Sequence, residues 1–379
     1  MTHRSRPLRL AACAAAVLAV LSACSSGTGS SSTGTAAAAG GAANSRASSS
    51  AAGSGSASAA EAEGEQAVGT GSGGLVVNNA QHENLTQAWA EEFSRETGIA
   101  IEMRNGSDNE LANQLVAEGS GSPADVFLTE NSPGMNIVEK AGLFAPIDAD
   151  TEAAVPQQFN PSTGRWVGIA ARSTVLVYNP ALVPESELPS SIMDLQDPSW
   201  SGRWAASPSG ADFQAIVSAI LQLKGADATS AWLDAMQSGA KAYRGNGTVM
   251  KAVNAGEVPA GVIYHYYWYG DQAGTGENSG KTKLLYWKNG DPGAFVSVSG
   301  GGVLASSTKQ QQAQQFLKFV TGKKGQQIVA DTVYEYPIGS QVPAKSALKP
   351  LSELQPPKVD PASLNGPEVT DLMTQAGLI

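Results

Sequence analysis

Three short polar or aromatic stretches each lie at or just after the end of a predicted buried strand. They are residues 79–83 (Asn-Ala-Gln-His-Glu), 127–131 (Phe-Leu-Thr-Glu-Asn) and 264–269 (Tyr-His-Tyr-Tyr-Trp-Tyr). In open α/β sheets, ligands bind in the crevice outside the carboxyl ends of the strands. We therefore expect side chains from all three stretches to face one crevice.

The side chains in these stretches suit a hard, highly charged cation. Such a cation prefers anionic oxygen donors, imidazole also suits iron, and tyrosinate is an iron ligand in proteins. A free Tyr titrates near about pH 10, but a bound metal can displace the proton of a coordinating group. Glu130 with the tyrosinates of Tyr266 and Tyr267 would neutralise Fe³⁺, and His82 would add a neutral donor. The sequence therefore predicts a ferric site.

Each of these four residues also has an ordinary explanation when it is taken alone. His82 can sit near a helix start, Glu130 can be a solvated loop acid, and the aromatic run can belong to a core or an interlobe contact. The two Tyr add a condition, because neighbouring side chains on a strand point to opposite faces. Tyr266 and Tyr267 can share one metal ion only if the chain leaves strand geometry there.

A further stretch predicts a place for an anion. Ser209, Gly210 and Ala211 precede or begin a predicted helix, and the free backbone N–H groups at a helix start favour an anion. A simple Ser N-cap is the plainer explanation. Asn246 lies just before another predicted helix, where a turn would explain it equally well.

Strands and helices alternate along the first part of the predicted fold, which is typical of a parallel α/β sheet. The predicted strands are 75–77, 99–103 and 124–128, and the predicted helices are 83–97, 110–118 and 135–140. Gly98 and Gly119 are expected to end the first two helices. A second α/β set has predicted helices at 211–224, 228–238 and 248–255 and predicted strands at 261–263 and 283–287, and further helices are predicted at 308–321, at 323–332 and near the C-terminus.

Two long extended runs, 172–178 and 294–304, connect these sets. Two α/β lobes joined by two crossing strands form a clamp that closes by hinge motion. We predict an α/β protein of two Rossmann-like lobes, with the ligand cleft between them. Lobe 1 is expected to comprise residues 74–172 and 297–347, and lobe 2 residues 173–296 and 348–379.

The first residues predict export. Residues 1–23 have a basic start, an apolar middle and small residues at the end, as in a secretory signal. The run Leu-Ser-Ala-Cys ending at Cys24 is similar to a bacterial lipobox, so we expect lipidation of Cys24 and anchoring outside the cytoplasm to the cell membrane. Residues 24–73 are mostly Ser, Gly, Ala and Thr, which predicts a flexible tether.

Composition narrows the class of protein further. Of the two Cys, Cys13 lies in the predicted signal, so the exported domain cannot form an internal disulfide. The chain has 24 Lys and Arg against 34 Asp and Glu, and the predicted signal holds three of the Arg and no acid. This acidic balance argues against a nucleic-acid partner, because such partners require basic patches.

Five separated segments, in order, resemble the periplasmic ferric-ion-binding proteins of bacterial ABC importers, also called bacterial transferrins. The resemblance runs from about Leu75 to the C-terminus. It rests on residues 78–82 (Asn-Asn-Ala-Gln-His), 123–130 (Pro-Ala-Asp-Val-Phe-Leu-Thr-Glu), 256–260 (Gly-Glu-Val-Pro-Ala), 266–269 (Tyr-Tyr-Trp-Tyr) and 291–294 (Asp-Pro-Gly-Ala). It implies a type 2 periplasmic-binding fold and a monomer that catalyses no reaction and delivers iron to a membrane permease.

The resemblance also implies a ligand set. Iron would be held by His82, Glu130, Tyr266 and Tyr267, with a synergistic anion such as phosphate or carbonate. The residues implied to contact this anion are Asn131, Ser209, Gly210, Ala211 and Asn246. Asn131 stands where the family often has Gln, and Tyr264-His265 stand where it often has Asn-Asn. Either difference could alter the set of residues that contact the iron and its anion. Arg172 matches a family Arg near the hinge, and we assign it no direct metal role.

Two other functions are compatible with the sequence. A protein of the same fold could bind a small organic cation or anion, such as thiamine or a polyamine, with the Tyr run stacked on it. A non-haem iron dioxygenase with two Tyr and two His would also fit the presence of His82 and His265. A shell closed by an anion would leave such an enzyme little room for substrate and oxygen, and the chain has no nucleophile-elbow motif.

Overall fold

The structure, a computed structural model, describes residues 73–379. The predicted signal, the predicted lipidation site Cys24 and nearly all of the predicted tether lie outside the described residues. Among the helices of 73–379, none is long and apolar enough to cross a membrane.

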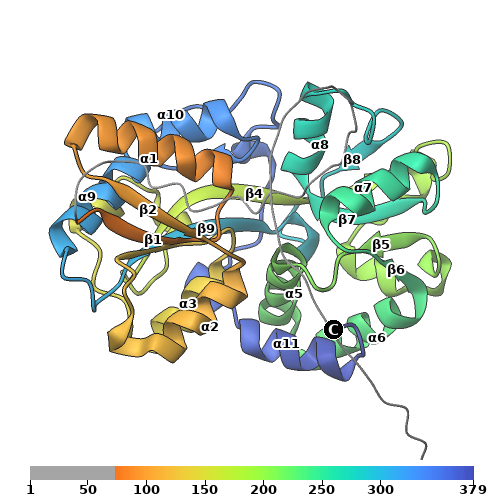
Figure 1. The fold of residues 1–379 in the computed structure, drawn as a ribbon. Helices are drawn as coiled ribbons and strands as arrows, with labels where there is room; N and C mark the ends of the chain where they lie inside the picture. Colours follow the sequence, from red (N-terminus) through yellow and green to blue (C-terminus); the bar gives the residue numbers. More distant parts are fainter. Residues whose placement is uncertain (1–72) are drawn as a thin grey trace, which may run out of the picture. The chain divides into compact units, whose positions relative to one another are not determined.

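Lobe 1 is built on a mixed sheet in which β2, β1, β3, β9 and β4 are neighbours in that order (Figure 1). β1 is parallel to both β2 and β3, whereas β9 is antiparallel to β3 and to β4. The strands of lobe 1 are β1 (Leu75–Asn79), β2 (Ile101–Asn105), β3 (Val126–Leu128), β9 (Val296–Val303), β10 (Tyr336–Pro337) and the first part of β4 (Val167–Tyr178). Its helices are α1 (Glu83–Thr97), α2 (Asp108–Glu118), α3 (Ser132–Lys140), α4 (Ala149–Ala153), α9 (Gln310–Thr321) and α10 (Lys323–Thr332).

Lobe 2 continues the same sheet order through β4, β7, β5 and β6. β7, β5 and β6 are parallel to one another, and β7 and β8 are antiparallel to β4. The strands are β5 (Trp204–Ala206), β6 (Ala240–Ala242), β7 (Ala260–Tyr264) and β8 (Lys283–Leu285). The helices are α5 (Ala211–Lys224), α6 (Ala226–Gly239), α7 (Asn246–Ala255), α8 (His265–Ala273) and α11 (Gly366–Gln375).

The strand β4 joins the two lobes. Residues 167–173 of β4 pair with β9, and residues 174–178 pair with β7 (Figure 1). The chain leaves lobe 2 at Phe295, which packs in the core of that lobe, and β9 begins in lobe 1 at Val296. The two extended runs predicted as crossing strands therefore cross side by side, with Arg172 opposite Ser297.

Helix ends follow the predicted glycines. Gly98 adopts the left-handed conformation (φ 73°) after α1, and its N–H donates to Ser94 O at 2.9 Å.

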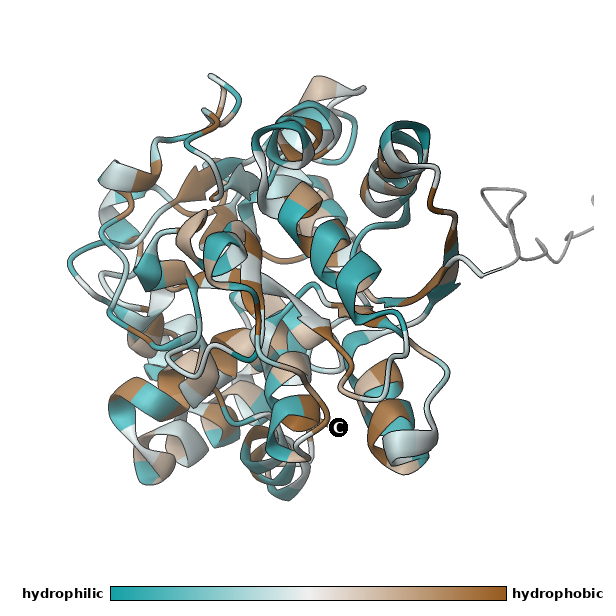
Figure 2. Ribbon diagram, turned by 90° about the vertical axis from the view of Figure 1, so that its left-hand side faces the viewer, coloured by the Kyte–Doolittle hydropathy of each residue, from teal (hydrophilic) through white to brown (hydrophobic). Residues whose placement is uncertain are grey.

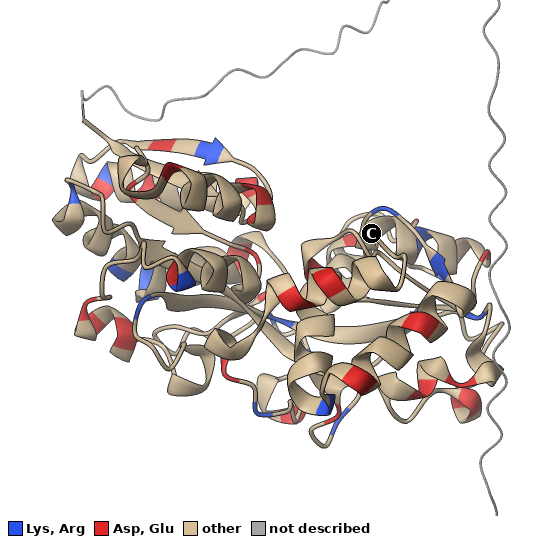
Figure 3. Cartoon of the chain, turned by 90° about the horizontal axis from the view of Figure 1, so that it is seen from below, with Lys and Arg blue, Asp and Glu red and all other residues tan. Residues whose placement is uncertain are grey.

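Most helices carry hydrophilic and hydrophobic residues on the same turns, as expected for elements with one buried side (Figure 2). Charged residues of both signs are interspersed over both lobes (Figure 3).

The centre of lobe 1 packs against the glycine-rich part of β9. Gly300 lies in β9, and a Cβ atom built there would lie 2.5 Å from Met135 Cγ and 2.9 Å from Trp166 Cε3. Gly is therefore required so that α3 and Trp166 can approach the strand closely.

Each lobe has its own hydrophobic core, and the C-terminal residues contribute to both. Leu348 and Leu354 pack in the core of lobe 1, whereas Leu364, Val369 and Met373 pack in that of lobe 2. The tail thus crosses between the lobes a further time, beside the two crossing strands.

Candidate metal centre

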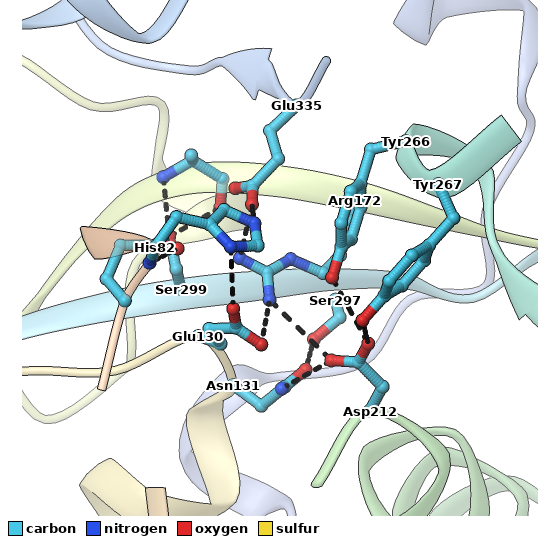
Figure 4. Close-up of polar contacts among 12 residues, drawn as sticks. His82, Glu130, Asn131, Arg172, Asp212, Tyr266, Tyr267, Ser297, Ser299 and Glu335 are labelled. Atoms are coloured by element: carbon cyan, nitrogen blue, oxygen red, sulfur yellow. Dashed lines mark hydrogen bonds and ion pairs between the residues drawn. The ribbon is translucent and has the colours of Figure 1, made fainter. Parts of the chain in front are cut away.

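His82 and Glu130 lie together at the carboxyl ends of two neighbouring parallel strands. His82 follows β1 and precedes α1, and Glu130 follows β3, which pairs with β1. His82 Nδ1 lies 2.9 Å from Glu130 Oε1 (Figure 4). The two side chains are 22% and 23% exposed, so this half of the site can be reached from solvent.

A buried carboxylate fixes the loop that carries Glu130. Asp108, the first residue of α2, accepts hydrogen bonds from the backbone N–H groups of Glu130 (2.8 Å) and Asn131 (3.1 Å). Burial raises the pKa of Asp108 to about 8, and the charge of Glu130 adds to this rise. The sequence analysis did not single out Asp108, because acids are common at helix starts.

Tyr266 and Tyr267 lie in the first turn of α8. β7 ends at Tyr264 and α8 begins at His265, so the chain leaves strand geometry at the point where the sequence analysis required it. The two rings stack with their centroids 4.2 Å apart. Both hydroxyls donate to Asp212 Oδ2, at 3.3 Å and 3.1 Å (Figure 4). The two phenol oxygens therefore converge on one point in lobe 2.

Asp212 is a site residue that the sequence analysis missed. It lies in the first turn of α5 and is buried. Besides the two Tyr hydroxyls, it accepts hydrogen bonds from Asn246 Nδ2 at 2.8 Å and from Asn131 Nδ2 at 2.9 Å. Asn131 and Asn246 were predicted to contact an anion, and in the structure both donate to this carboxylate.

The other three predicted anion contacts form the turn that leads into α5. Gly210 is the N-cap of the helix, its N–H donates to Ser207 O at 3.1 Å, and Ala211 is the first helical residue. Ser209 is exposed. Among the hydrogen bonds and ion pairs of residues 73–379, none joins these three residues to the four candidate ligands.

Two further buried charges complete the cluster, and the sequence analysis assigned a site role to neither. Arg172 lies on β4 where the strand passes between the lobes. Its guanidinium is 2.9 Å from Glu335 Oε1, 3.7 Å from Glu130 Oε2 and 3.8 Å from Asp212 Oδ1 (Figure 4). Arg172 and Glu335 are both fully buried. Arg172 therefore connects acids of lobe 1 with an acid of lobe 2.

The cluster holds its protons tightly. Burial alone would lower the pKa of His82, but Glu130 and Glu335 outweigh it and raise this pKa to about 10. Burial and the nearby Asp212 charge raise the pKa values of Tyr266 and Tyr267 above their usual range. Only a strong competing cation would therefore remove these protons near neutral pH.

The two halves of the cluster touch where the lobes meet. The His82 ring of lobe 1 meets the Tyr266 ring of lobe 2 edge-on, with centroids 5.1 Å apart. Within residues 73–379, His, Cys, Asp and Glu by themselves form no group of three that could hold a metal ion. A metal centre here would draw on the Tyr pair as well, because tyrosinate oxygen is a donor that suits a hard trivalent cation.

Comparison with known proteins agrees with this architecture. The family of bacterial extracellular solute-binding proteins matches residues 79–327. The chain belongs to this family. A relative from Serratia marcescens, named "Fe(3+)-binding periplasmic protein", is 61% identical over 307 residues, which are 81% of this chain and 91% of the relative. The "major ferric iron-binding protein" of Neisseria meningitidis serogroup B is 34% identical, over 80% of this chain and 93% of its own length.

Solved structures confirm the predicted fold of this solute-binding protein. The crystal structure of iron-bound HitA from Pseudomonas aeruginosa superimposes with a TM-score of 0.75 at 41% identity, and the match covers 80% of this chain and 99% of HitA. The prediction of a two-lobed α/β fold of the type 2 periplasmic-binding class is thus confirmed.

His265 and Tyr264, which together form one of the two departures noted in the sequence, lie behind the Tyr pair. Both are fully buried. His265 Nδ1 accepts a hydrogen bond from the Ser173 N–H of the crossing strand at 3.1 Å, and its ring stacks on Tyr336 at 4.7 Å. Burial lowers the pKa of His265 to about 3, so it is neutral. These contacts assign His265 to the packing of α8 against the hinge.

A cavity of about 1070 Å³ lies on the other side of β9 from the charged cluster. Its lining includes Val296 and Val298 but none of the four candidate ligands. Ser297, between these two Val, points the opposite way and donates to Asn131 Oδ1 at 2.9 Å. The alternation of side chains along β9 thus separates the cavity from the candidate metal centre.

Proposed function

We propose that this protein captures Fe³⁺ between its lobes and delivers it to the membrane permease of an ABC importer. The observation that carries the proposal is the convergence of His82 and Glu130 of lobe 1 with Tyr266 and Tyr267 of lobe 2. The ferric-binding relatives from Serratia and Neisseria support it. The protein acts as a receptor and catalyses no reaction.

Asp212 adds a fifth ligand group to the four predicted from the sequence. Its Oδ2 atom already contacts both Tyr hydroxyls, at 3.3 Å and 3.1 Å, so a cation bound by the two tyrosinates would also meet this carboxylate. Glu130, Asp212 and the two tyrosinates together carry four negative charges. With the buried Glu335 the negative charges number five, against four positive charges from Fe³⁺ and Arg172.

This charge count bears on the predicted synergistic anion. Asn131 and Asn246, two of its predicted contacts, are engaged by the Asp212 carboxylate at 2.9 Å and 2.8 Å. Phosphate or carbonate would add negative charge to a cluster that already carries more negative than positive charge. We therefore propose that Asp212 supplies the charge expected of the anion, and that iron binding requires neither phosphate nor carbonate.

The N-terminal residues are the basis for a proposal about where in the cell the protein acts. We propose that residues 1–23 direct export, that Cys24 is lipidated, and that the following tether holds a monomeric receptor near its permease outside the cytoplasm. Replacement of Cys24 by Ser is expected to move the protein from the membrane fraction to the soluble extracytoplasmic fraction. A Cys24→Ser variant that stays in the membrane fraction contradicts the anchor.

Visible absorption tests whether the protein binds Fe³⁺ through the Tyr pair, because tyrosinate–Fe³⁺ pairs absorb visible light. Purified protein mixed with ferric citrate should colour, and a Tyr266→Phe, Tyr267→Phe double variant should stay pale. Tyr243→Phe is a matched control, since this hydroxyl contacts Glu257 at 3.4 Å, away from the cluster. The proposal fails if the wild-type protein stays colourless and retains no iron on gel filtration.

The role of Asp212 is tested separately in buffer that contains neither phosphate nor carbonate. The wild-type protein should bind one iron there, and Asp212→Asn should bind at least about 10- to 100-fold more weakly, the range found when residues that orient metal ligands are lost. Added phosphate should partly rescue Asp212→Asn. A wild-type protein that needs added phosphate contradicts the role of Asp212 but leaves the ferric function intact.

A further inference from the structure

Glu335 is a fully buried carboxylate that touches the candidate ligand His82 from behind. Glu335 Oε1 lies 2.8 Å from His82 Nε2, on the side of the imidazole away from Glu130 (Figure 4). Nδ1 of the same ring lies 2.9 Å from Glu130 Oε1. The Nε2 contact is a close ion pair rather than an aligned hydrogen bond. The two ring nitrogens of His82 thus face two different carboxylates.

The backbone around Glu335 is held firmly. The next residue, Tyr336, begins β10 and pairs with Ala171 of β4. The Tyr336 hydroxyl donates to Lys349 O at 2.7 Å, and its ring stacks on His265 of α8. The Glu335 carboxylate is also 2.9 Å from Arg172, on the crossing strand. Its position is therefore fixed from both the sheet and the hinge.

We infer that Glu335 is a positioning residue that orients the His82 ring for metal binding. Histidines that ligate metals almost always contact a carboxylate, carbonyl or water through their other ring nitrogen, and this contact fixes both the tautomer and the orientation of the ring. With Nε2 held by Glu335, Nδ1 is the nitrogen presented to the metal, beside Glu130. This inference rests on the proposed ferric function.

Arg172 makes Glu335 suitable for this role. An unpaired buried carboxylate would be strongly disfavoured, and the guanidinium at 2.9 Å keeps it ionised inside the protein. The same oxygen, Oε1, serves both Arg172 and His82. Glu335 can therefore hold the imidazole from the hinge while it stays fully buried.

A double-mutant cycle tests whether Glu335 acts through His82. Ferric affinity is measured by competition with citrate for the wild-type protein, Glu335→Gln, His82→Ala and the double variant. Loss of a residue that orients a metal ligand typically weakens binding about 10- to 100-fold. Glu335→Gln should show this loss in the wild-type background and less than about threefold loss in the His82→Ala background.

The result that overturns the inference is an equal loss in both backgrounds, or no loss in either. A general structural role would give the former, because damaged folding does not depend on His82. Asp125→Asn is a matched control, since Asp125 is also a buried carboxylate of lobe 1 but contacts Ser307 and the Val76 N–H. It should show no coupling to His82. A wild-type protein that binds no iron would instead refute the proposed function.

A spectroscopic measurement keeps the inference testable if Glu335→Gln folds poorly. Gallium is a diamagnetic trivalent ion that can replace iron in nuclear magnetic resonance. In ¹⁵N-labelled, gallium-loaded wild-type protein, the His82 ring should carry its proton on Nε2 and its metal on Nδ1. The opposite assignment, with metal on Nε2, would overturn the inference.

Discussion

Iron binding to this protein should strengthen steeply as pH rises from about 6 to 8. The pKa of His82 is raised to about 10, and those of Tyr266 and Tyr267 lie above their usual range, so all three groups are protonated at neutral pH. Ligation requires a neutral imidazole and two tyrosinates. Binding therefore releases about three protons, and metal affinity depends on pH accordingly.

The magnitude follows from this proton count. Each released proton changes the binding constant about tenfold per pH unit, or about 1.36 kcal/mol. Three protons give about 1000-fold, or about 4 kcal/mol, per pH unit. The sign is fixed because raised pKa values stabilise the protonated, iron-free protein. That stabilisation is lost as pH rises toward these pKa values, so alkaline conditions favour the complex and acid releases the iron. The pKa of Asp212 is also raised, chiefly by burial, and any proton that it carries steepens the slope.

Competition against a chelator of known proton stoichiometry measures the slope. The pH dependence of the chelator's own iron affinity is subtracted first. The logarithm of the iron affinity of the wild-type protein should then rise by about three per pH unit. Tyr267→Phe should lower the slope by about one, and Tyr243→Phe should leave it unchanged. A wild-type slope of one or less, or an unchanged slope for Tyr267→Phe, would refute the reasoning.

Other substitutions test the packing. Gly261→Ala should lower the free energy of unfolding by about 1–3 kcal/mol in urea titrations, because its Cβ would lie 2.4 Å from Val249 Cγ1. Gly247→Ala should instead raise it by about 0.5–1 kcal/mol, since nothing lies within 4 Å of that Cβ; the reverse order would contradict the packing. Arg172→Leu should lower the free energy of unfolding by about 3–5 kcal/mol by removing the guanidinium that pairs with the buried Glu335. Adding Glu335→Leu should restore much of that loss, and no restoration would count against the ion pair.

Most of the fold was predictable because it follows local rules. Strands and helices alternate with clear periodicity through α1, α2 and β3, and Gly98 ends α1 where expected. The helix α8 was missed because its His-Tyr-Tyr-Trp-Tyr start is rich in residues that favour strands. Tertiary contacts determine it instead, including the stack of His265 on Tyr336 and the hydrogen bond from Trp268 Nε1 to Thr282 Oγ1 at 3.0 Å.

The candidate metal centre was predictable only where residue type was unusual. His82 and the adjacent Tyr pair are rare enough to attract attention, and the structure brings them together, although their role as ligands remains a prediction. Asp212 looks like an ordinary first-turn acid. Glu335 lies far along the chain from His82 in an unremarkable stretch. Their importance comes from the crossing of β4 and β9, which no local pattern in the sequence reveals.

The space behind β9 has a mechanical consequence. Protein interiors are normally as dense as organic crystals, so bending a central strand displaces its neighbours. Val296 and Val298 border about 1070 Å³ of cavity, which leaves the crossing strands room to flex on that side. One lobe can therefore rotate against the other without compressing either hydrophobic core. Such a rotation would separate the candidate ligands of lobe 1 from those of lobe 2, which lie on the same side of β9 as Ser297.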